Sequence, residues 1–431
     1  MLEPRVFLYD ELPPEDTAML QALYSRSAAS DREHVEKVRS SGSGKFMETY
    51  YVGYSHKSIG DCGTTTLFFE GVSELAAKAI QDWQLYNGQQ TSTRYIDFTQ
   101  QPVIDPLGTA ASAAVLEGWM AFYRAALEPV AIHLRTLYPR GAAEQAGIYE
   151  KAIKARAFDI CRAFLPAGVT TQLSWHTNLR QAWDKLSWMR HHPLAELRKL
   201  AEKAATALQG QYPNSFNYKL YETQEAYRLS AAASHTYFLP TIKPEFSFHS
   251  SIEMDELDLY KELLQNRPIK TELPPFLDEL GMVRFDFQLD FGSFRDIQRH
   301  RHGVCRMPLL TGELGFEPWY LKQLPDSLRR VVEQLLVEQR KKVAALECSP
   351  ETRQYYLAMG FRVACRITSP LPAAVYTAEL RSGATVHPTL RPIAHRMCDA
   401  LQVAFPTLML HCDRSPDDFD IRRGEQDITE K

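Results

Sequence analysis

The chain has 431 residues, of which 45% are hydrophobic and 24% are charged, and its formal net charge at pH 7 is −4. This length and composition suit a globular protein of two domains with ordinary buried cores. The slightly acidic balance argues against a general role in nucleic-acid binding, because domains with that role are usually strongly basic. No apolar run approaches the ~20 residues that a transmembrane helix needs, so we expect no association with a membrane.

The seven cysteines show neither a Cys-x-x-Cys pair nor the spacing of a zinc site, so we assign no metal. The odd number of cysteines and the lack of a signal-peptide pattern at the N-terminus predict reduced thiols and a cytoplasmic location.

The first half of the chain shows the patterns of several helices and a few short strands. We expect helices over Thr17–Ala29, Glu74–Tyr86, Ala110–Tyr138, Glu150–Phe164 and Gln181–Leu208. We expect strands over Lys45–Gly53 and Thr64–Phe69, and a strand or a helical turn over Thr170–Trp175. This mixture predicts an α+β fold.

Prolines weaken the periodicity between Gln209 and Phe248, so we place a domain junction there. The predicted domains are residues 1–225 and 226–412, each a β-sheet flanked by long helices. Later helices are expected over Met254–Leu264, Ser327–Leu346 and Pro392–Val403. The tail, residues 413–431, is charged and lacks apolar periodicity, which predicts disorder.

A strand and a basic segment stand near the middle of the second domain. Residues Val283–Phe291 alternate between apolar and polar types, the pattern of a half-buried strand. Gly292 and Ser293 then interrupt the run, and Ser293 is a candidate N-cap. A helix that begins there would carry four basic residues on one face: Arg295, Arg299, His302 and Arg306. Such a face attracts phosphate groups, although a merely solvated basic surface is the alternative interpretation.

The two halves of the chain repeat certain features. A strand, a short turn and a helix are expected both at Thr64–Gln84 and at Val283–Arg301. The pairs Leu165-Pro166 and Leu371-Pro372 are each followed by a threonine five residues after the proline, and the two prolines lie 206 residues apart. We interpret these echoes as a tandem duplication.

Two short motifs resemble the flavin-dependent thymidylate synthases (ThyX). The signature of that family is Arg-His-Arg, seven residues, Ser, one residue, then Arg-Tyr. The first half has Ser92-Thr93-Arg94-Tyr95 but carries Asp82-Trp83-Gln84 where Arg-His-Arg belongs. The second half has Arg299-His300-Arg301 but carries Leu309, Thr311 and Gly312 at the later positions. Each half keeps the part of the signature that the other half lacks.

Further parts of the first half are similar to the family pattern. Ser55-His56-Lys57-Ser58 resembles its Gly-His-x-Ser turn, with Cys62 in place of a later histidine. Arg162–Pro166, Thr171, Trp175 and Asn178–Arg180 resemble its C-terminal motif, and Arg190 matches a later arginine if one extra residue is allowed. The resemblance covers most of residues 20–205 and, more weakly, residues 270–400.

The resemblance implies two fused ThyX-like domains and a flavoprotein. In that family FAD takes hydride from NADPH, and methylenetetrahydrofolate supplies the carbon that is placed on C5 of dUMP. The flavin performs the chemistry, so no protein group is assigned as catalytic. The flavin-binding candidates are Arg299, His300, Arg301, Asn178 and Arg190. The candidates for the pyrimidine nucleotide are Ser92, Arg94, Tyr95 and Arg162.

Each candidate also has a plainer interpretation. Arg162 is expected at a helix end, where it would neutralise carbonyl groups. Arg94 is close enough in sequence to pair with Asp97, and His300 would be an ordinary packed or solvated histidine. The alternative to an enzyme is a non-catalytic assembly or regulatory protein that keeps the fold and one ligand.

The resemblance also implies an oligomer, because ThyX enzymes are homotetramers with sites at subunit interfaces. Two fused chains would rebuild such a tetramer as a homodimer. Composite sites would then join Arg299–Arg301 to Ser92, Arg94 and Arg162. The remaining sites, which pair Asp82 with Leu309, would be empty or filled by side chains.

Overall fold

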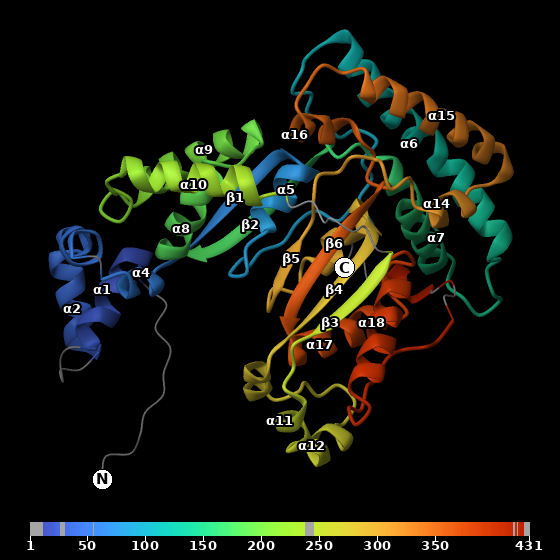
Figure 1. Cartoon of the computed structure of the whole chain (residues 1–431). Coiled ribbons are helices and arrows are strands. Elements are labelled where there is room, and N and C mark those ends of the chain that lie inside the picture. Colours follow the sequence, from blue (N-terminus) through green and yellow to red (C-terminus); the bar gives the residue numbers. More distant parts are fainter. Residues whose placement is uncertain are drawn as a thin grey trace. The chain divides into compact units, whose positions relative to one another are not determined.

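The computed structural model describes residues 12–25, 31–54, 56–237, 245–416, 419 and 421–425 (Figure 1). Helices and two small β-sheets make up these residues, in agreement with the expected α+β class. The chain forms two compact units. Unit 1 consists of Met1–Phe69, Leu85–Gln89 and Leu173–Thr236, and unit 2 consists of Glu70–Gln84, Gln90–Gln172 and Tyr237–Lys431.

Unit 2 therefore combines segments from both halves of the sequence. It includes the Ser92–Tyr95 segment and Arg162 as well as the Arg299–Arg301 segment. The division into two domains at residues 1–225 and 226–412 stays a prediction.

Unit 1 is mainly helical. Its helices are α1 (Pro14–Tyr24), α2 (Asp31–Ser41), α3 (Gly44–Phe46), the π-helical η1 (Met47–Gly53), α4 (Ser58–Asp61), α8 (Leu179–Met189), α9 (Ala195–Gln211) and α10 (Glu222–His235). The strands β1 (Thr64–Ser73) and β2 (Thr170–Asn178) form a two-stranded sheet, and each strand passes from one unit into the other. The expected strand at Lys45–Gly53 is wrong, because this segment is helical and buries Met47 and Tyr51 on the same side.

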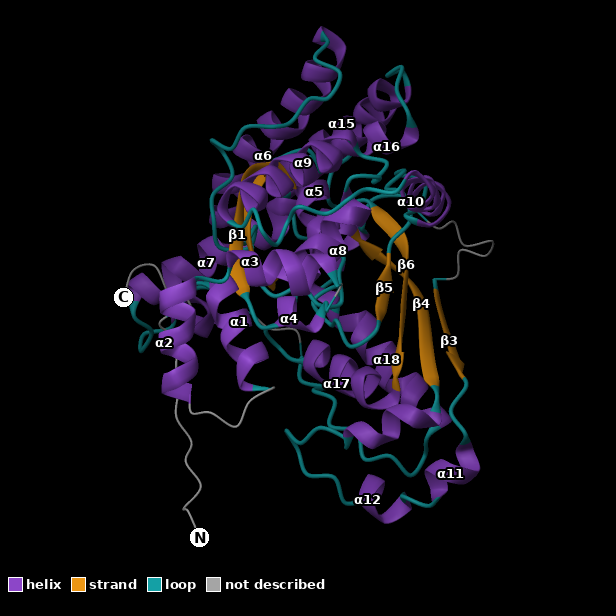
Figure 2. Cartoon of the chain, turned by 90° about the vertical axis from the view of Figure 1, so that its left-hand side faces the viewer, coloured by secondary structure: helices purple, strands orange, loops and turns teal. Residues whose placement is uncertain are grey.

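Unit 2 is built on a four-stranded antiparallel sheet in the order β3-β4-β6-β5. Its strands are β3 (Phe246–Ser250), β4 (Met282–Asp290), β5 (Val304–Arg306) and β6 (Arg362–Pro370). The pairing of β4 with β6 runs from Met282 opposite Pro370 to Asp290 opposite Arg362. Figure 2 shows the strands edge to edge, and α17 (Leu371–Ser382) and α18 (Arg391–Ala404) pack against β3, β4 and β6.

The remaining helices of unit 2 complete its core. They are α5 (Glu74–Gln81), α6 (Ala110–Leu137), α7 (Ala146–Cys161), η2 (Arg162–Phe164), α11 (Met254–Asp258), α12 (Lys261–Gln265), η3 (Pro275–Leu280), α13 (Phe291–Ile297), α14 (Pro318–Lys322), α15 (Asp326–Ala344), α16 (Pro350–Arg353), η4 (Gln354–Tyr356) and η5 (Ile421–Glu425). The predicted strand at Val283–Phe291 is confirmed as β4, whose apolar residues Val283, Phe285, Phe287 and Leu289 are buried. Burial of such side chains stabilises a sheet by about 1.5–3 kcal/mol each.

Several strands run directly into helices. Ser73 ends β1 and caps α5, Asn178 ends β2 and caps α8, and Asp290 ends β4 and caps α13. In each case the side-chain oxygen accepts a hydrogen bond from a backbone N–H in the first turn. The strand and helix expected at both Thr64–Gln84 and Val283–Arg301 are therefore present, whereas the shared origin of the two halves stays a prediction.

The two Leu-Pro pairs occupy different places in the fold. Leu165-Pro166 lies between η2 and β2, but Leu371-Pro372 begins α17 after β6. Pro166 pairs in a β-bridge with Ala358, which lies between η4 and β6.

Two further expectations need correction. Cys398 and Cys412 form a disulfide with a Cα–Cα distance of 6.6 Å, so the cysteines are not all free thiols. In the expected disordered tail, Asp413 accepts a hydrogen bond from the backbone N–H of Ala384, and Ile421–Glu425 forms η5. These residues are part of the fold, whereas residues 417–418, 420 and 426–431 lie outside the described residues.

Candidate functional site

The Arg299-His300-Arg301 segment, which we call the triplet, occupies the turn between α13 and β5. The helix ends at Ile297, and β5 then pairs with β6. The expected basic stripe is therefore wrong. Arg306 belongs to a strand, and Arg295 is buried in an ion pair with Glu74. Of the residues expected on the stripe, Arg299 is the one that belongs to the triplet. Its side chain is 56% exposed.

His300 is held by Arg381 of α17. The Nε–H of Arg381 donates to Nε2 of His300 over 2.8 Å, and the Nη2 group of Arg381 donates to the backbone carbonyl of Asp296 over 2.6 Å. Burial, followed by the charge of Arg381, lowers the pKa of His300 to about 3. His300 is therefore neutral at physiological pH, with its Nε2 acting as a hydrogen-bond acceptor.

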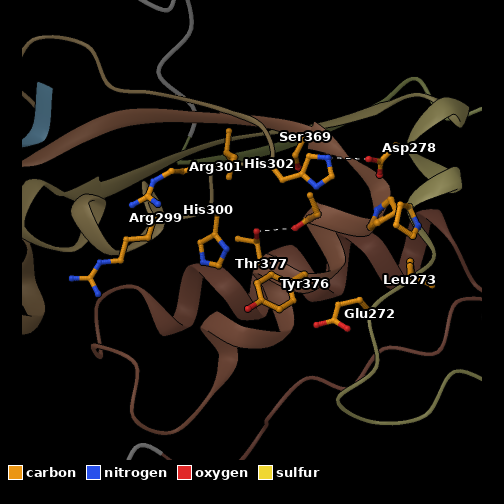
Figure 3. Close-up of a pocket in the computed structure, with 14 residues that line it drawn as sticks. Glu272, Leu273, Asp278, Arg299, His300, Arg301, His302, Ser369, Tyr376 and Thr377 are labelled. Carbon is orange, nitrogen blue, oxygen red and sulfur yellow. Dashed lines mark hydrogen bonds and ion pairs between the residues drawn. The ribbon is translucent and has the colours of Figure 1, made fainter. Parts of the chain in front are cut away.

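The triplet lines a cavity of about 380 Å³, which we call the triplet cavity. Its other charged or aromatic lining residues are Glu272, Asp278, His302 and Tyr376. Figure 3 shows Arg299 and Arg301 at one end of this set and Glu272 and Asp278 at the other. The ring of His300 lies 5.9 Å from that of Tyr376, and His302 pairs with Asp278 over 2.9 Å. The cavity thus offers cationic groups and a planar aromatic side chain to a ligand.

The Ser92–Tyr95 segment forms a turn in which the Ser92 hydroxyl accepts a hydrogen bond from the backbone N–H of Arg94 over 3.2 Å. Arg94 does not pair with Asp97. Its guanidinium instead forms two hydrogen bonds, of 2.7 and 3.1 Å, with the carboxylate of the fully buried Asp159 on α7. Burial alone would lower the pKa of Arg94, but the carboxylate of Asp159 outweighs burial and raises it. Tyr95 is exposed on the same turn.

Arg162 lies at the end of α7 and is only 1% exposed. Its Nη2 group donates to the Ser293 hydroxyl over 2.8 Å. That hydroxyl also contacts Thr389 and the buried His387, at 2.7 and 3.3 Å. Within the described part of the chain, the buried Nε–H of Arg162 has no acceptor. Such an unsatisfied buried donor is uncommon and marks a place where a ligand oxygen could be accommodated.

Asp296 of α13 connects these groups electrostatically. Burial would raise its pKa, but the charges of Arg162, Arg94, Arg299 and Arg381 outweigh burial and hold the pKa below the ordinary range. We call these four arginines the arginine cluster. Three carboxylates interact electrostatically with members of the cluster: Asp159, Asp290 and Asp296. The arginines therefore outnumber the carboxylates. An excess of positive charge in a buried setting suits an anionic ligand.

The structure therefore brings the predicted residues together only in part. Arg299 belongs both to the triplet cavity and to the arginine cluster, and Arg94 and Arg162 belong to the cluster. Ser92, Arg94 and Arg162 are not among the residues that line the triplet cavity.

The remaining two candidates, Asn178 and Arg190, lie in unit 1. Asn178 caps α8 by accepting from the backbone N–H of Gln181, and Arg190 pairs with Glu225 at 3.6 Å. Their observed contacts are those of structural residues within unit 1.

The segment Asp82-Trp83-Gln84 lines a second cavity of about 200 Å³ together with His300 and Arg301 of the triplet. Gln84 donates to the backbone carbonyl of Gly303 over 3.1 Å, and Asp82 pairs with Lys78 at 2.9 Å. Asp82-Trp83-Gln84 and the triplet are thus neighbours within the chain. The expected pairing of Asp82 with Leu309 in a dimer stays a prediction.

Sequence reasoning missed four residues that shape the site: Asp159, Asp296, Arg381 and His387. None belongs to a recognisable motif, and the four residues come from α7, α13, α17 and the segment before α18. Among the described residues, no group of three or more His, Cys, Asp or Glu side chains could hold a metal ion. No helix that the structure describes has the length and apolar character needed to span a membrane.

Comparison with known proteins gives a family for the first half of the chain. Residues 8–214 match the family model Thy1, described as thymidylate synthase complementing protein. The chain is similar to a UPF0159 protein of Chlamydia pneumoniae, with 25% identity over 81% of this chain and 76% of the relative. It is also similar to a UPF0159 protein of Thermoplasma acidophilum, with 23% identity over 91% of this chain and 94% of the relative.

Proposed function

The chain belongs, through residues 8–214, to the thymidylate synthase complementing protein family, and from this premise we propose that it is a flavin-dependent enzyme. The proposed reaction is reductive transfer of a one-carbon unit to C5 of a pyrimidine nucleotide, dUMP or an analogue. The observation that carries the proposal is the position of the triplet, whose three residues line one cavity and adjoin the arginine cluster.

The residues of the triplet cavity fit a flavin. The guanidinium of Arg299 is accessible, and its planar fork suits a phosphate group or the face of a ring. Tyr376 supplies an aromatic surface. His300 is neutral and its Nε2 already accepts from Arg381, so the group that it offers to a ligand is its Nδ1–H donor. The volume of about 380 Å³ is near the lower end of the range for ligand sites, so it suits one part of FAD.

When bound, FAD would supply the hydride chemistry, with NADPH as the reductant and methylenetetrahydrofolate as the carbon donor. The protein side chains would bind and orient the reactants. Ser92, Arg94 and Arg162 would hold the 5′-phosphate of the nucleotide, because a hydroxyl and two guanidinium groups suit a dianion. Arg94 would have to exchange at least one of its two hydrogen bonds to Asp159 for a bond to phosphate.

A second candidate function is a non-catalytic protein that binds a flavin or a nucleotide and acts in assembly or regulation. One observation favours it. The two arginines among the nucleotide candidates already have protein partners, since Arg94 is paired with Asp159 and Arg162 donates to Ser293. Under this alternative the flavin binds but no pyrimidine nucleotide is converted.

We further propose that the protein is a homodimer, in which the triplet of one subunit meets the Ser92–Tyr95 segment of the other. The support is that Ser92 and Arg94 are outside the lining of the triplet cavity in a single chain. The mass of the purified protein in solution, measured by light scattering, tests this proposal directly. A monomer at all concentrations would contradict it.

The function is tested by the absorption spectrum of the purified protein after incubation with FAD. We expect a flavin band that survives gel filtration, and its loss in the double variant Arg299→Ala, Arg301→Ala. The matched control is Arg330→Ala, Arg340→Ala, which removes two exposed arginines from α15. Full flavin content in the first double variant would contradict the assignment. Incubation with FAD, NADPH, methylenetetrahydrofolate and dUMP, analysed by mass spectrometry, then separates an enzyme from a binding protein.

A further inference from the structure

A third cavity of unit 2 lies beside the triplet cavity. It has a volume of about 370 Å³ and lies between α17 and the loop that follows α12. We call it the Lys270 cavity. It shares Glu272, Leu273 and Tyr376 with the triplet cavity. Figure 3 labels these three shared residues among those that line the triplet cavity. The two cavities are therefore neighbours that share part of their lining.

One wall of the Lys270 cavity is apolar. Val375, Tyr376 and Leu380 belong to α17, and Ile269 and Leu273 belong to the loop. Positions 375, 376 and 380 lie within one face of the helix because they are separated by one, four and five residues. Ile269 and Leu380 are large apolar residues left exposed here. Such a wall suits the hydrophobic ring of a small ligand.

The lining also carries two cationic residues, Lys270 and Arg267. Lys270 has a φ angle of 60° and is the one non-glycine residue with positive φ among the residues that the structure describes. A lysine in this region of backbone space is uncommon and costs free energy, so a binding role for its side chain is a reasonable explanation.

The second cationic residue is Arg267, whose side chain is only 4% exposed. It pairs with Glu379 and donates to the backbone carbonyl of Met409 over 2.8 Å. Its buried Nε–H nevertheless has no acceptor among the described residues. Arg267 lines the cavity, so a ligand oxygen that reaches this donor would complete the hydrogen bonding of Arg267.

The charges select the kind of ligand. Glu379 is neutralised by Arg267 and also accepts from the backbone N–H of His411 over 2.7 Å. Lys270 is thus the cation available to pair with a ligand, and Glu272 lies at the boundary with the triplet cavity. We propose that the Lys270 cavity is a second binding site, for a small organic anion that carries an apolar ring. Its acidic group would contact Lys270 and Arg267, and its ring would contact Leu380 and Tyr376.

This site is independent of the proposed function, because none of its evidence involves a flavin. It nevertheless adjoins the triplet cavity through Tyr376. Tyr376 lines both cavities, so we expect a ligand bound in one to alter the affinity for a ligand in the other.

The probe for the test is 8-anilinonaphthalene-1-sulfonate, an anion with aromatic rings, whose fluorescence rises on transfer from water to an apolar site. We expect saturable binding to the full-length protein. Lys270→Glu should weaken binding at least tenfold, because it replaces an attractive charge by a repulsive one. Lys270→Arg keeps the charge and should stay within about threefold of the wild type. Binding of equal strength to Lys270→Glu and to the wild type would overturn the proposal.

Two further variants show where the probe binds and whether Lys270 is strained. Arg299→Ala, Arg301→Ala should leave probe binding within twofold of the wild type, and its loss in this variant would place the probe in the triplet cavity instead. Lys270→Gly should raise the melting temperature, since glycine adopts positive φ without steric cost. It should also weaken the binding of the probe, because it removes the positive charge. A fall in melting temperature would show that the backbone at residue 270 carries no strain, which removes one support of the proposal.

Discussion

The guanidinium of Arg94 forms a two-pronged ion pair with the carboxylate of Asp159, which is fully buried on α7. This pair joins the Ser92–Tyr95 turn to the helix that ends at Arg162. It keeps a family-matching arginine in place, and it also occupies the donors that a phosphate would need. Asp159 therefore has a structural role that competes with the proposed role of Arg94.

We predict that Asp159→Asn lowers the free energy of unfolding by about 3 kcal/mol, because it leaves a largely buried guanidinium without its counter-charge. Inorganic phosphate should restore more stability to this variant than to the wild type, since an anion that binds only the folded state stabilises it. Urea unfolding with and without phosphate measures both effects. The control is Asp399→Asn, which breaks the exposed pair with Arg414 and should cost less than about 1 kcal/mol. Equal responses of Asp159→Asn and wild type to phosphate would contradict the competition.

A second prediction concerns pH. The pKa of His300 is about 3 in the folded protein, below the value of about 6.5 expected in the unfolded chain. Between these values the unfolded state binds a proton that the folded state does not, so acidification favours unfolding. The stability contribution of neutral His300 is complete above pH 6.5 and declines as the pH falls towards 3.

His300→Gln should remove this decline. The slope of unfolding free energy against pH should be smaller in the variant by up to about 1.4 kcal/mol per pH unit between pH 4 and 6. Urea unfolding at several pH values measures the slope, and the window from pH 7.5 to 9 serves as an internal control. If His300→Gln and the wild type have the same slope between pH 4 and 6, the pKa of His300 is not lowered in the folded protein.

The third prediction assigns Arg295 to stability rather than to ligand binding. Arg295 pairs with the buried Glu74 and donates to the Thr93 hydroxyl over 3.0 Å. Glu74→Gln should therefore cost about 3 kcal/mol of unfolding free energy. Glu117→Gln, which breaks an exposed pair with Arg124, should cost less than about 1 kcal/mol. Folded Glu74→Gln protein should bind FAD as the wild type does, and a selective loss of FAD would contradict this assignment.

The strand at Val283–Phe291 was predictable from the sequence, but the basic stripe after it was not. Alternating apolar residues specify one buried face locally, and β4 has that face. The helix after it stops early because residues 304–306 pair with β6, a contact between distant segments. Gly303 permits this turn, since a Cβ atom there would lie 2.7 Å from the carbonyl oxygen of Thr368. Tertiary pairing thus overrode the helical spacing of the basic residues.

The candidate site was predictable to the extent that motifs mark it. The triplet lines a cavity, and Arg94 and Arg162 approach the same aspartate. Their partners Asp296 and Arg381 are 85 residues apart, and they meet only because α13 and α17 both pack near β4. No local pattern in one sequence encodes such a meeting. The strand expected at Lys45–Gly53 failed for a related reason, because β-propensity is decided by what the segment packs against.

The fourth prediction concerns the disulfide between Cys398 and Cys412, which closes a short loop that includes the end of α18. Thiol titration of the denatured, unreduced protein should find five free cysteines: Cys62, Cys161, Cys305, Cys348 and Cys365. Replacing both paired cysteines by alanine should lower the free energy of unfolding by about 3 kcal/mol, as expected for a loop of this length. Seven titratable thiols before reduction would show that the pair is not formed.

The last prediction tests the nucleotide part of the proposed function. If Arg94 holds a 5′-phosphate, Arg94→Ala should weaken the binding of a pyrimidine 5′-monophosphate about 10–100-fold. The reason is that a charge-assisted hydrogen bond contributes roughly 1.5–3 kcal/mol. The corresponding nucleoside lacks the phosphate, so its affinity should change little. Arg162 is buried, and Arg162→Lys is the better variant there because it keeps the charge while losing the planar fork. Calorimetric titration with both ligands measures the difference, after thermal unfolding has shown that each variant is folded. Equal losses for the nucleotide and the nucleoside would mean that these arginines only support the fold, as their bonds to Asp159 and Ser293 already do in the free protein.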